Sequence, residues 1–259
     1  MLRIKYLFHI SWYHLLFNHS FIIKKRDSKL SLSKGVRIRR SKIILEEGAS
    51  LFIGKETHLE KSSIVVSRGS IIKIGDANII SSKSIRVNGE LSVGDRNYLV
   101  DRSGHIWLQK GSLHIGNCNR IKANVWIRFD GIVIIGNYNT INDRTQLRCD
   151  ERIEIGSYNQ ISMDIRIWDT NTHRIFSTED SYKEHIISHY PNWNEDEKPK
   201  TKPVKIGDCN WLGEDVIVKS SKIGNHCILG TRTMLINREI GDDLSVTNII
   251  EYRIVEYSE

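Results

Sequence analysis

A step from an aliphatic residue to glycine returns about every 20 residues, and it constrains this chain more than any other feature. With isoleucine or valine before the glycine, the step occurs nine times, first at Ile53-Gly54 and last at Ile240-Gly241, with successive spacings of 21, 19, 22, 20, 20, 51, 17 and 17 residues. Repeats of this length are typical of solenoids, in which each unit stacks on its neighbours. The one long spacing leaves room for a further coil and an excursion of roughly 30 residues.

Within each unit the aliphatic residues recur with a period of six. Ile135, Ile141 and Leu147 are six residues apart, and Ile155 follows eight residues later. Three such positions per unit predict a triangular coil of three short strands with the aliphatic side chains inside. A helical period of 3.6 and simple alternation both fit poorly. At the corners, in segments such as IGNYN, we expect Gly and Asn to take the positive φ angles. The predicted prism spans residues 36–250, with an excursion over 174–203.

The pattern [LIV]-G-x4 resembles that of the hexapeptide-repeat acyltransferases, whose fold is an all-β, left-handed parallel β-helix. The most specific stretch is KPVKIGDCNWLGEDVIVKSSKIGNHCILGTRTMLINREIGDD. It is similar to the block with which these enzymes bind CoA between adjacent coils. The resemblance covers about four-fifths of the chain. The resemblance implies acyl transfer from acetyl-CoA as co-substrate and assembly as a homotrimer. Within this family, the chain resembles the polysaccharide and sialic-acid O-acetyltransferases in particular.

Positive charge is concentrated at the start of the chain. Residues 1–48 hold eleven Lys and Arg against three acidic residues, a net charge of +8, whereas the whole chain carries +7. We expect residues 1–35 to form an apolar and basic segment, helical in structure, that contacts a membrane surface or an acidic glycan. A solvated terminus is the alternative reading of the same charges. Nucleic acid is not an expected partner.

Cysteine usage and hydropathy indicate a cytoplasmic protein. Cys118, Cys149, Cys209 and Cys227 show neither CxxC nor zinc-finger spacing, so we expect small, buried, reduced side chains and no metal. No run of about 20 apolar residues is present, so no transmembrane helix is expected. Residues 251–259 are expected to form a tail.

His173 is the predicted general base. It stands six residues after Ile167, where the repeat breaks, and a neutral imidazole accepts a proton near pH 7. The segment Ile167–His173 resembles the Asp-x-x-His element of the family, in which Asp169 or Asn171 would orient the ring. A polar corner residue is the alternative interpretation of His173.

The C-terminal coils hold the other predicted site residues. By resemblance, Trp211 would line the acetyl site, although it could instead seal a subunit interface. The predicted CoA contacts are two glycines for the pantetheine arm and three cations for the phosphates: Gly213, Gly230, Lys219, Arg232 and Arg238. The family has a run of small residues where this chain has Gly230-Thr231-Arg232-Thr233.

The excursion carries its own candidates. A long loop inside a compact fold is typical of an active-site cover. His185 and His189 are four residues apart, a spacing found in metal sites on helices, but the sequence shows no third ligand.

The sequence favours an O-acetyltransferase that acts on a bacterial surface glycan, such as a sialic acid, a capsule or a lipopolysaccharide sugar. N-acetylation of an amino-sugar nucleotide needs the same base and remains open. A zinc enzyme of the carbonic-anhydrase type would need three converging histidines, a pattern that His105, His114, His173 and His226 do not form. A non-enzymatic, glycan-binding β-helix is the last alternative.

Overall fold

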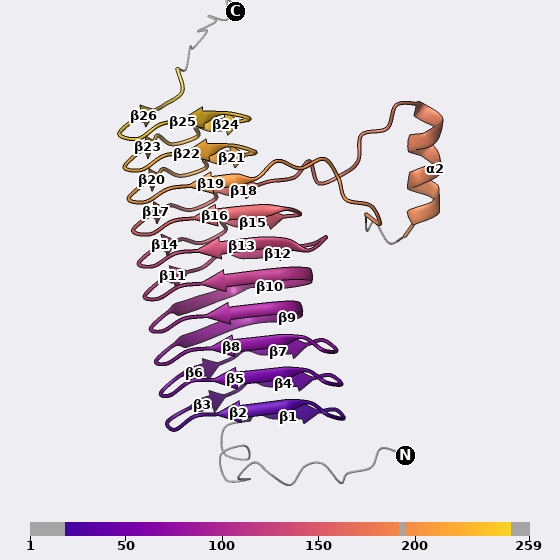
Figure 1. The fold of residues 1–259 in the computed structure, drawn as a ribbon, viewed down its shortest axis with the longest axis vertical. Coiled ribbons are helices and arrows are strands. Elements are labelled where there is room, and N and C mark those ends of the chain that lie inside the picture. The colour runs from indigo at the N-terminus through magenta and orange to yellow at the C-terminus, as the bar shows by residue number, and fades with distance from the viewer. Residues whose placement is uncertain (1–18, 192–194, 250–259) are drawn as a thin grey trace, which may run out of the picture.

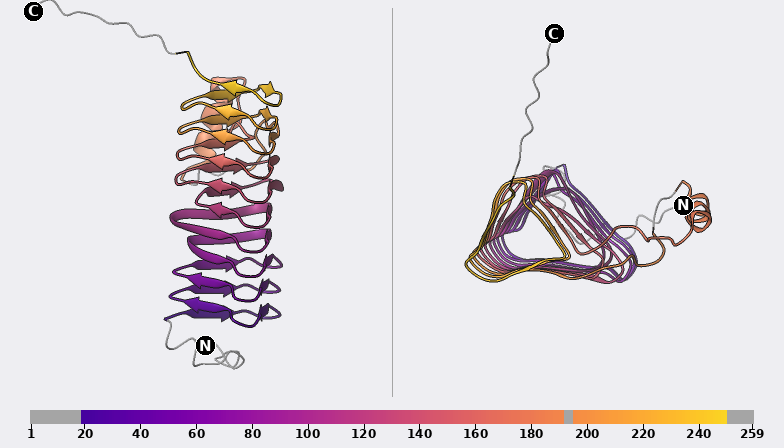
Figure 2. Two further views of the ribbon diagram at one scale, coloured as in Figure 1. Left: turned by 90° about the vertical axis from the view of Figure 1, so that its left-hand side faces the viewer. Right: turned by 90° about the horizontal axis from the view of Figure 1, so that it is seen from above.

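The computed structural model describes residues 19–191 and 195–249, and it stacks parallel strands into one column of triangular coils (Figures 1 and 2). Most strands pair in parallel with the strand three places along the chain, as β12 does with β15 and β15 with β18. The strands therefore form three flat faces. The predicted fold class, an all-β, left-handed parallel β-helix with a long excursion, is confirmed.

Each face contains one strand, or one part of a strand, from every coil. The first face contains β1 (Phe21–Lys24), β4 (Lys42–Leu45), β7 (Ser63–Val66), the middle of β9 (Ile79–Val93) and of β10 (Tyr98–Ile115), β12 (Asn124–Ile127), β15 (Gln146–Cys149), β18 (Arg166–Trp168), β21 (Ile217–Lys219) and β24 (Met234–Ile236). The second face contains β2 (Lys29–Leu32), β5 (Ser50–Ile53), β8 (Ile71–Ile74), the ends of β9 and β10, β13 (Gly131–Ile135), β16 (Arg152–Ile155), β19 (Val204–Ile206), β22 (Lys222–Ile223) and β25 (Glu239–Ile240). The third face contains β3 (Arg37–Arg39), β6 (His58–Glu60), the starts of β9 and β10, β11 (Arg120–Ile121), β14 (Thr140–Ile141), β17 (Gln160–Ile161), β20 (Trp211–Leu212), β23 (Ile228–Leu229) and β26 (Ser245–Val246).

The core is a ladder of aliphatic side chains along the axis of the column. Ile135, Ile141 and Leu147, six residues apart in one coil, are each at most 1% exposed. Burial of one such side chain contributes about 1.5–3 kcal/mol. Because each coil adds its own set on top of the last, the column is a rigid support for the side chains that point outward.

The corners correct one expectation about glycine. Gly136 has no positive φ; instead, a Cβ there would lie 2.6 Å from the carbonyl oxygen of Gly156 on the next coil. The positive φ, 57°, falls on Tyr138. The Asn139 amide donates to Oδ1 of Asn119 at 2.8 Å, and this ladder of asparagines continues from coil to coil. The glycine of this Ile-Gly step is therefore needed for close stacking of the coils and not for its dihedral freedom.

The β-helix begins earlier than predicted. Phe21–Lys24 and Lys29–Leu32 are strands of the first coil, so the predicted helix over residues 1–35 is wrong for its second half. Residues 1–18 and the predicted tail, 251–259, lie outside the described residues. Among the described residues, no helix is both long enough and apolar enough to cross a membrane.

The cysteines differ from one another in exposure. Cys149 and Cys227 are buried, as expected, whereas Cys209 is exposed and Cys118 is half-buried, so the prediction of four buried thiols is wrong for these two. Cys118 and Cys209 occupy outward corner positions with φ of 59°, whereas Cys149 points into the core. All four are unpaired thiols.

Candidate active site

The excursion leaves the column at the corner between the first and second faces and forms an arm (Figures 1 and 2). It follows β18 and returns to β19, and it contains the single helix α2 (Glu179–His189) of the described residues. Two backbone hydrogen bonds tie its two ends together, from Asn171 N to Lys200 O at 3.1 Å and from Lys202 N to Asp169 O at 2.8 Å. The arm is therefore anchored to the coil at its base.

Glu195 lies at the centre of a polar cluster inside the arm. Its side chain is 3% exposed, and its Oε1 lies 2.8 Å from Nδ1 of His173 and 3.7 Å from Nε2 of His185. Its Oε2 lies 3.7 Å from Nε of Arg174 and is buried without a hydrogen-bond partner. The buried Glu195 carboxylate thus lies between the side chains of His173, Arg174 and His185.

The His173 ring has the arrangement that a general base requires. Its side chain is 67% exposed, although its Nδ1 faces the buried Glu195. Among the described residues, its Nε2 has no hydrogen-bond partner. A carboxylate that accepts from Nδ1–H fixes the neutral tautomer with a free lone pair on Nε2. The pair can therefore take a proton from a hydroxyl group that approaches from solvent.

Arg174 balances the negative charge of this cluster. Its guanidinium lies 3.6 Å from Oδ1 of Asp196, it forms an ion pair with Glu197, and its second amino group contacts Nδ1 of His185 at 3.2 Å. One arginine thus connects the helix α2 to the acidic segment after residue 194. This connection keeps Glu195 beside the histidine.

The three groups His185, His189 and Asp196 bring possible metal ligands within 4.8 Å of one another. Asp196 is the third ligand that the sequence did not reveal. Nδ1 of His185 and the Asp196 carboxylate, however, both face the Arg174 guanidinium. The Arg174 guanidinium therefore already supplies a positive charge beside His185 and Asp196, as a metal ion would.

Aromatic and cationic side chains cover the first face beside the arm. Trp126, Arg148 and Trp168 stand in register on β12, β15 and β18, and the Arg148 guanidinium lies 4.2 Å from the Trp126 ring centroid. Trp107 stacks on Trp126 with ring centroids 5.5 Å apart. Lys219 continues the row on β21. The row forms a wall along which an extended ligand can lie.

Several donors in this wall have no partner. Nε1 of Trp126, Nε1 of Trp168 and Nε of Arg148 are buried without a hydrogen bond within the described part of the chain. Burial lowers the pKa of the Arg148 guanidinium, the nearby charge of Arg128 lowers it further, and Glu195 opposes the shift.

Asp169 has a different role from the one predicted. It is fully buried, and its carboxylate accepts the backbone amides of Asp150, Glu151 and Arg152 at 2.8, 2.7 and 2.6 Å. Burial raises the pKa of Asp169, although the hydrogen bonds that it accepts oppose this shift. Because its oxygens are used at the coil corner, Asp169 does not orient His173. Glu195 takes that place.

Trp211 is not beside His173 in the same chain. It is 53% exposed at the start of β20 on the third face, in register with Gln160 and Ile228, whereas the arm leaves between the other two faces. Within one chain, Trp211 and His173 therefore lie on different sides of the column. The excursion shortens the separation along the axis but does not bring the two faces together.

The five predicted CoA residues fall at the two ends of the first face. Gly213, Gly230 and Arg232 lie at the corner that precedes β21 and β24, whereas Lys219 and Arg238 lie at the end of β21 and just after β24. A Cβ on Gly213 would come 2.8 Å from the backbone nitrogen of Thr231, so coil stacking already accounts for this glycine. Arg232 is 74% exposed and lies 3.8 Å from Asp215.

No sequence pattern pointed to Glu195 or to the buried pair of Arg128 and Asp150. Glu195 belongs to an acidic and proline-containing stretch that reads as solvated loop. Arg128 donates to both carboxylate oxygens of Asp150 at 2.8 and 2.6 Å, and it also contacts the carbonyl of Thr172, directly before His173. From the sequence alone, a buried charged residue of a repeat cannot be distinguished from one on the surface.

Comparisons with known proteins give one family model and several structures. The G8 domain model matches residues 58–163, less than half of the chain. Among solved structures, the polySia-specific acetyltransferase NeuO is 16% identical over 93% of this chain and 90% of its own, with a TM-score of 0.44. The polysialic acid O-acetyltransferase OatWY is 16% identical over 93% and 94%, with a TM-score of 0.42.

A third similar structure is UDP-N-acetylglucosamine O-acyltransferase (LpxA) from Moraxella catarrhalis RH4, 17% identical over 87% of this chain and 63% of its own, with a TM-score of 0.30. No curated protein matches the sequence. Because all three TM-scores lie below 0.5, these likenesses place neither a substrate nor a catalytic residue in this chain.

Proposed function

We propose that this protein is an acetyl-CoA-dependent O-acetyltransferase that modifies a bacterial surface glycan, with His173 as general base. The observation that carries the proposal is the pairing of Nδ1 of His173 with the buried Glu195, which leaves Nε2 open to solvent. The pair stands at the root of the arm, beside the aromatic and cationic wall of the first face. Acyl transfer to an alcohol needs such a base and a long groove.

The proposed reaction is direct transfer in a ternary complex. Nε2 of His173 takes the proton of the acceptor hydroxyl while its oxygen forms a bond to the thioester carbonyl carbon. The resulting tetrahedral intermediate collapses, the carbon–sulfur bond breaks, and the imidazolium returns the proton to the leaving thiolate. Glu195 stabilises the imidazolium that exists between the two steps, as a carboxylate beside histidine does in other acyl transfers.

Acetyl-CoA is the proposed co-substrate, and the last coils are its proposed site. Lys219 follows Trp168 in register on the first face, and Arg238 is exposed one coil further on. Their cations would meet the CoA phosphates, with Arg232 at the opposite corner. Gly213 and Gly230 would leave the backbone accessible to the pantetheine arm. The use of acetyl-CoA also places the proposed reaction in the cytoplasm.

The acceptor is proposed as a sialic acid, a capsule or a lipopolysaccharide sugar. NeuO and OatWY are acetyltransferases of polysialic acid, so polysialic acid is the first acceptor to test on this chain. Incubation with acetyl-CoA should add acetyl groups to at least one surface glycan, as measured by the mass of the acceptor. A mass readout is preferable to a thiol reagent because Cys209 is exposed and would react. Acetylation of an amino-sugar nucleotide alone would instead establish N-acetyl transfer.

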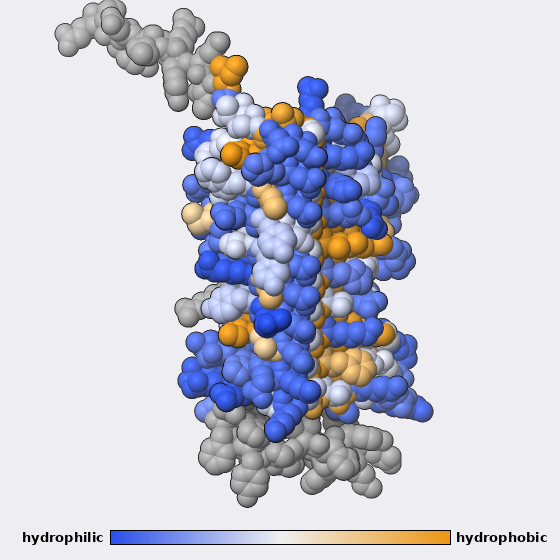
Figure 3. Space-filling view, turned by 60° about the vertical axis from the view of Figure 1, so that its left-hand side comes forward, coloured by the Kyte–Doolittle hydropathy of each residue, from blue (hydrophilic) through white to orange (hydrophobic). Residues whose placement is uncertain are grey.

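We further propose that the protein is a homotrimer. Trp211 and Ile228, adjacent on β20 and β23, are 53% and 43% exposed, and Met234 on β24 is 55% exposed. Figure 3 shows hydrophobic residues in separate patches on a largely hydrophilic surface. Neighbouring apolar side chains that are both exposed are typical of subunit contacts, and closed symmetry would let each copy cover the pair Trp211 and Ile228.

The trimer is tested by mass in solution. Light scattering of the wild-type protein at micromolar concentration should give three times the chain mass. The double variant Trp211→Asp with Ile228→Asp should give a single chain mass, because two charges would be buried at the contact. A matched double change at exposed aromatic positions of the neighbouring corner, Tyr138→Asp with Tyr158→Asp, should keep the trimer. A wild-type protein that is monomeric throughout would refute the assembly.

A further inference from the structure

A second surface, remote from His173, gathers positive charge. The corner between the third and first faces is hollowed over the first four coils, with a volume of about 480 Å³. We call this hollow the basic groove. Four cations line it, Arg40, Lys42, Lys61 and Lys83, and none of its described lining residues is acidic.

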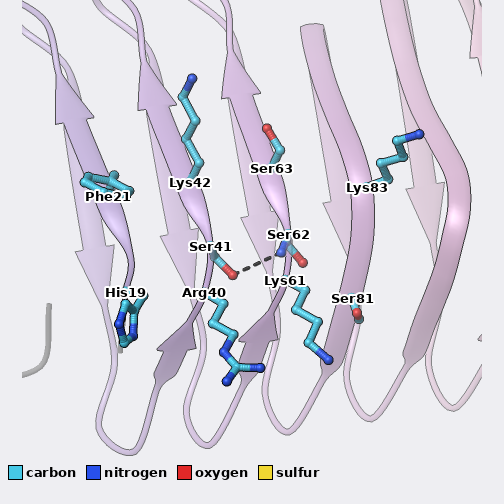
Figure 4. Close-up of a pocket in the computed structure, with 10 residues that line it drawn as sticks. All are labelled: His19, Phe21, Arg40, Ser41, Lys42, Lys61, Ser62, Ser63, Ser81 and Lys83. Carbon is cyan, nitrogen blue, oxygen red and sulfur yellow. Dashed lines mark hydrogen bonds between the residues drawn. The ribbon is translucent and has the colours of Figure 1, made fainter. Parts of the chain in front are cut away.

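The floor of the basic groove is rigid and polar. Figure 4 shows serines from successive coils side by side, with the cations extending away from them. The Ser62 amide donates to Oγ of Ser41 at 3.1 Å, and the Ser82 amide donates to Oγ of Ser62 at 3.2 Å. The hydroxyl groups of Ser63 and Ser81 have no protein partner among the described residues. The floor therefore offers free hydroxyls beside the cations.

The cations of the basic groove differ from the other cations of these coils. Lys25, Arg68 and Lys73 each lie within 3.4 Å of a glutamate carboxylate on a neighbouring coil. In the groove, Lys61 reaches Glu60 only at 4.0 Å, and within the described chain Arg40, Lys42 and Lys83 have no acidic partner. Because these like charges are held close together, they repel one another, and a bound anionic ligand would offset this repulsion.

The form of the groove indicates what kind of anion it fits. Its cations come from successive coils, which are about 4.8 Å apart along the axis, so they form a track for an extended chain and not a pocket for one ion. Only Phe21 among the lining residues is a large apolar side chain, which disfavours insertion into a membrane. Hydroxyls mixed with cations match a chain that carries both carboxylates and hydroxyl groups.

We propose that the basic groove binds the chain of an acidic polysaccharide and holds a long acceptor at a second place on the protein. The identity of that chain as the acceptor rests on the proposed function. Five coil steps separate β7, at the groove, from β18, before His173, which is about 24 Å at the usual strand spacing. A long acidic chain can therefore contact both places, whereas a short acceptor contacts only the site at His173.

The test measures binding, independently of turnover. The groove variant carries glutamine at four positions, Arg40→Gln, Lys42→Gln, Lys61→Gln and Lys83→Gln. The control variant removes the same charge from exposed cations one corner away that have no ion pair in the described chain: Lys34→Gln, Lys55→Gln, Arg96→Gln and Arg120→Gln. Binding of labelled polygalacturonate is measured by fluorescence anisotropy at about 50 mM and about 200 mM salt, the range over which contacts to polyanions weaken strongly.

We expect the wild-type protein to bind polygalacturonate. The groove variant should bind it about 30-fold more weakly, because the modest losses of affinity from four exposed charge contacts multiply. The control variant should change affinity less than about threefold. Neutral dextran should not bind. Equal weakening in both variants would mean that only net charge matters, and it would overturn the proposal.

Two further probes separate other polyanions from the polysaccharide. If phosphatidylserine vesicles, or duplex DNA, bind through the groove more tightly than polygalacturonate does, the proposed ligand class is overturned.

If the groove variant loses its circular dichroism spectrum, the single variants Lys42→Gln and Lys83→Gln replace it, each with about a twofold expected loss of affinity. Acetylation of a short acceptor should be unchanged in the groove variant. A failure of acetylation in the wild-type protein would refute the proposed function and leave the binding result intact.

Discussion

Replacing His173 by alanine is expected to lower kcat for glycan acetylation by about 10²- to 10⁴-fold, the usual contribution of a general base. The affinity for acetyl-CoA should change little, because His173 lies on the arm and the proposed CoA residues lie on the coils after it. Steady-state rates with acetyl-CoA and the best acceptor, together with calorimetric binding of CoA, measure the two effects.

The chain contains a matched control for this variant. His226 is also exposed and also pairs through Nδ1 with a carboxylate at 2.8 Å, that of Asp243, but it lies at a corner remote from the arm. His226→Ala should keep wild-type turnover. If His173→Ala remains active while its fold is intact, His173 is not the base, and His185 becomes the next residue to test.

Glu195 is expected to act as a positioning residue for His173. Glu195→Gln keeps the size of the side chain but loses the charge that stabilises the imidazolium, so kcat should fall about 10- to 100-fold while KM changes little. A merely structural role would raise KM and lower kcat together, and it would leave the shape of the kcat–pH profile unchanged. A shift of that profile in Glu195→Gln therefore distinguishes orientation of the base from support of the arm.

The fold was predictable because the sequence pattern that specifies it is local and recurs in almost every coil. An aliphatic residue at every sixth position and glycine at every third corner specify a triangular coil wherever they occur. The first coil escaped prediction because it lacks the aliphatic-Gly step: Leu32 is followed by Ser33, and the strand Phe21–Lys24 leaves most of its side chains exposed. A terminal coil is covered on one side only, so its sequence is less constrained than that of an inner coil.

The candidate site was predictable only where it interrupts the repeat. His173 was found because it stands at the break after Ile167. Its partner Glu195 lies 22 residues further on, across an arm without periodicity, and only the folded arm brings the two together. Asp169 was placed wrongly for the same reason, because sequence proximity to His173 suggested contact, while the coil directs its carboxylate to the amides of the preceding coil.

Replacing Asp169 by alanine is expected to destabilise the coils at the base of the arm by about 3 kcal/mol, because buried amides that lose their acceptor cost about 1–3 kcal/mol each. The carboxylate accepts hydrogen bonds from three backbone amides, those of Asp150, Glu151 and Arg152. Urea unfolding followed by circular dichroism should show a lower midpoint.

Hydrogen exchange adds a local readout to this prediction. In Asp169→Ala the amides of residues 150–152 should exchange faster, whereas those of distant coils such as Ile43–Leu45 should not, since each coil contacts only its neighbours. Asp143→Ala is the control: it removes an aspartate whose partner is the surface cation Lys122 at 2.9 Å, and it should cost less than about 1 kcal/mol. An unchanged midpoint in Asp169→Ala would mean that the three amides find other acceptors, and it would contradict this structural role of Asp169.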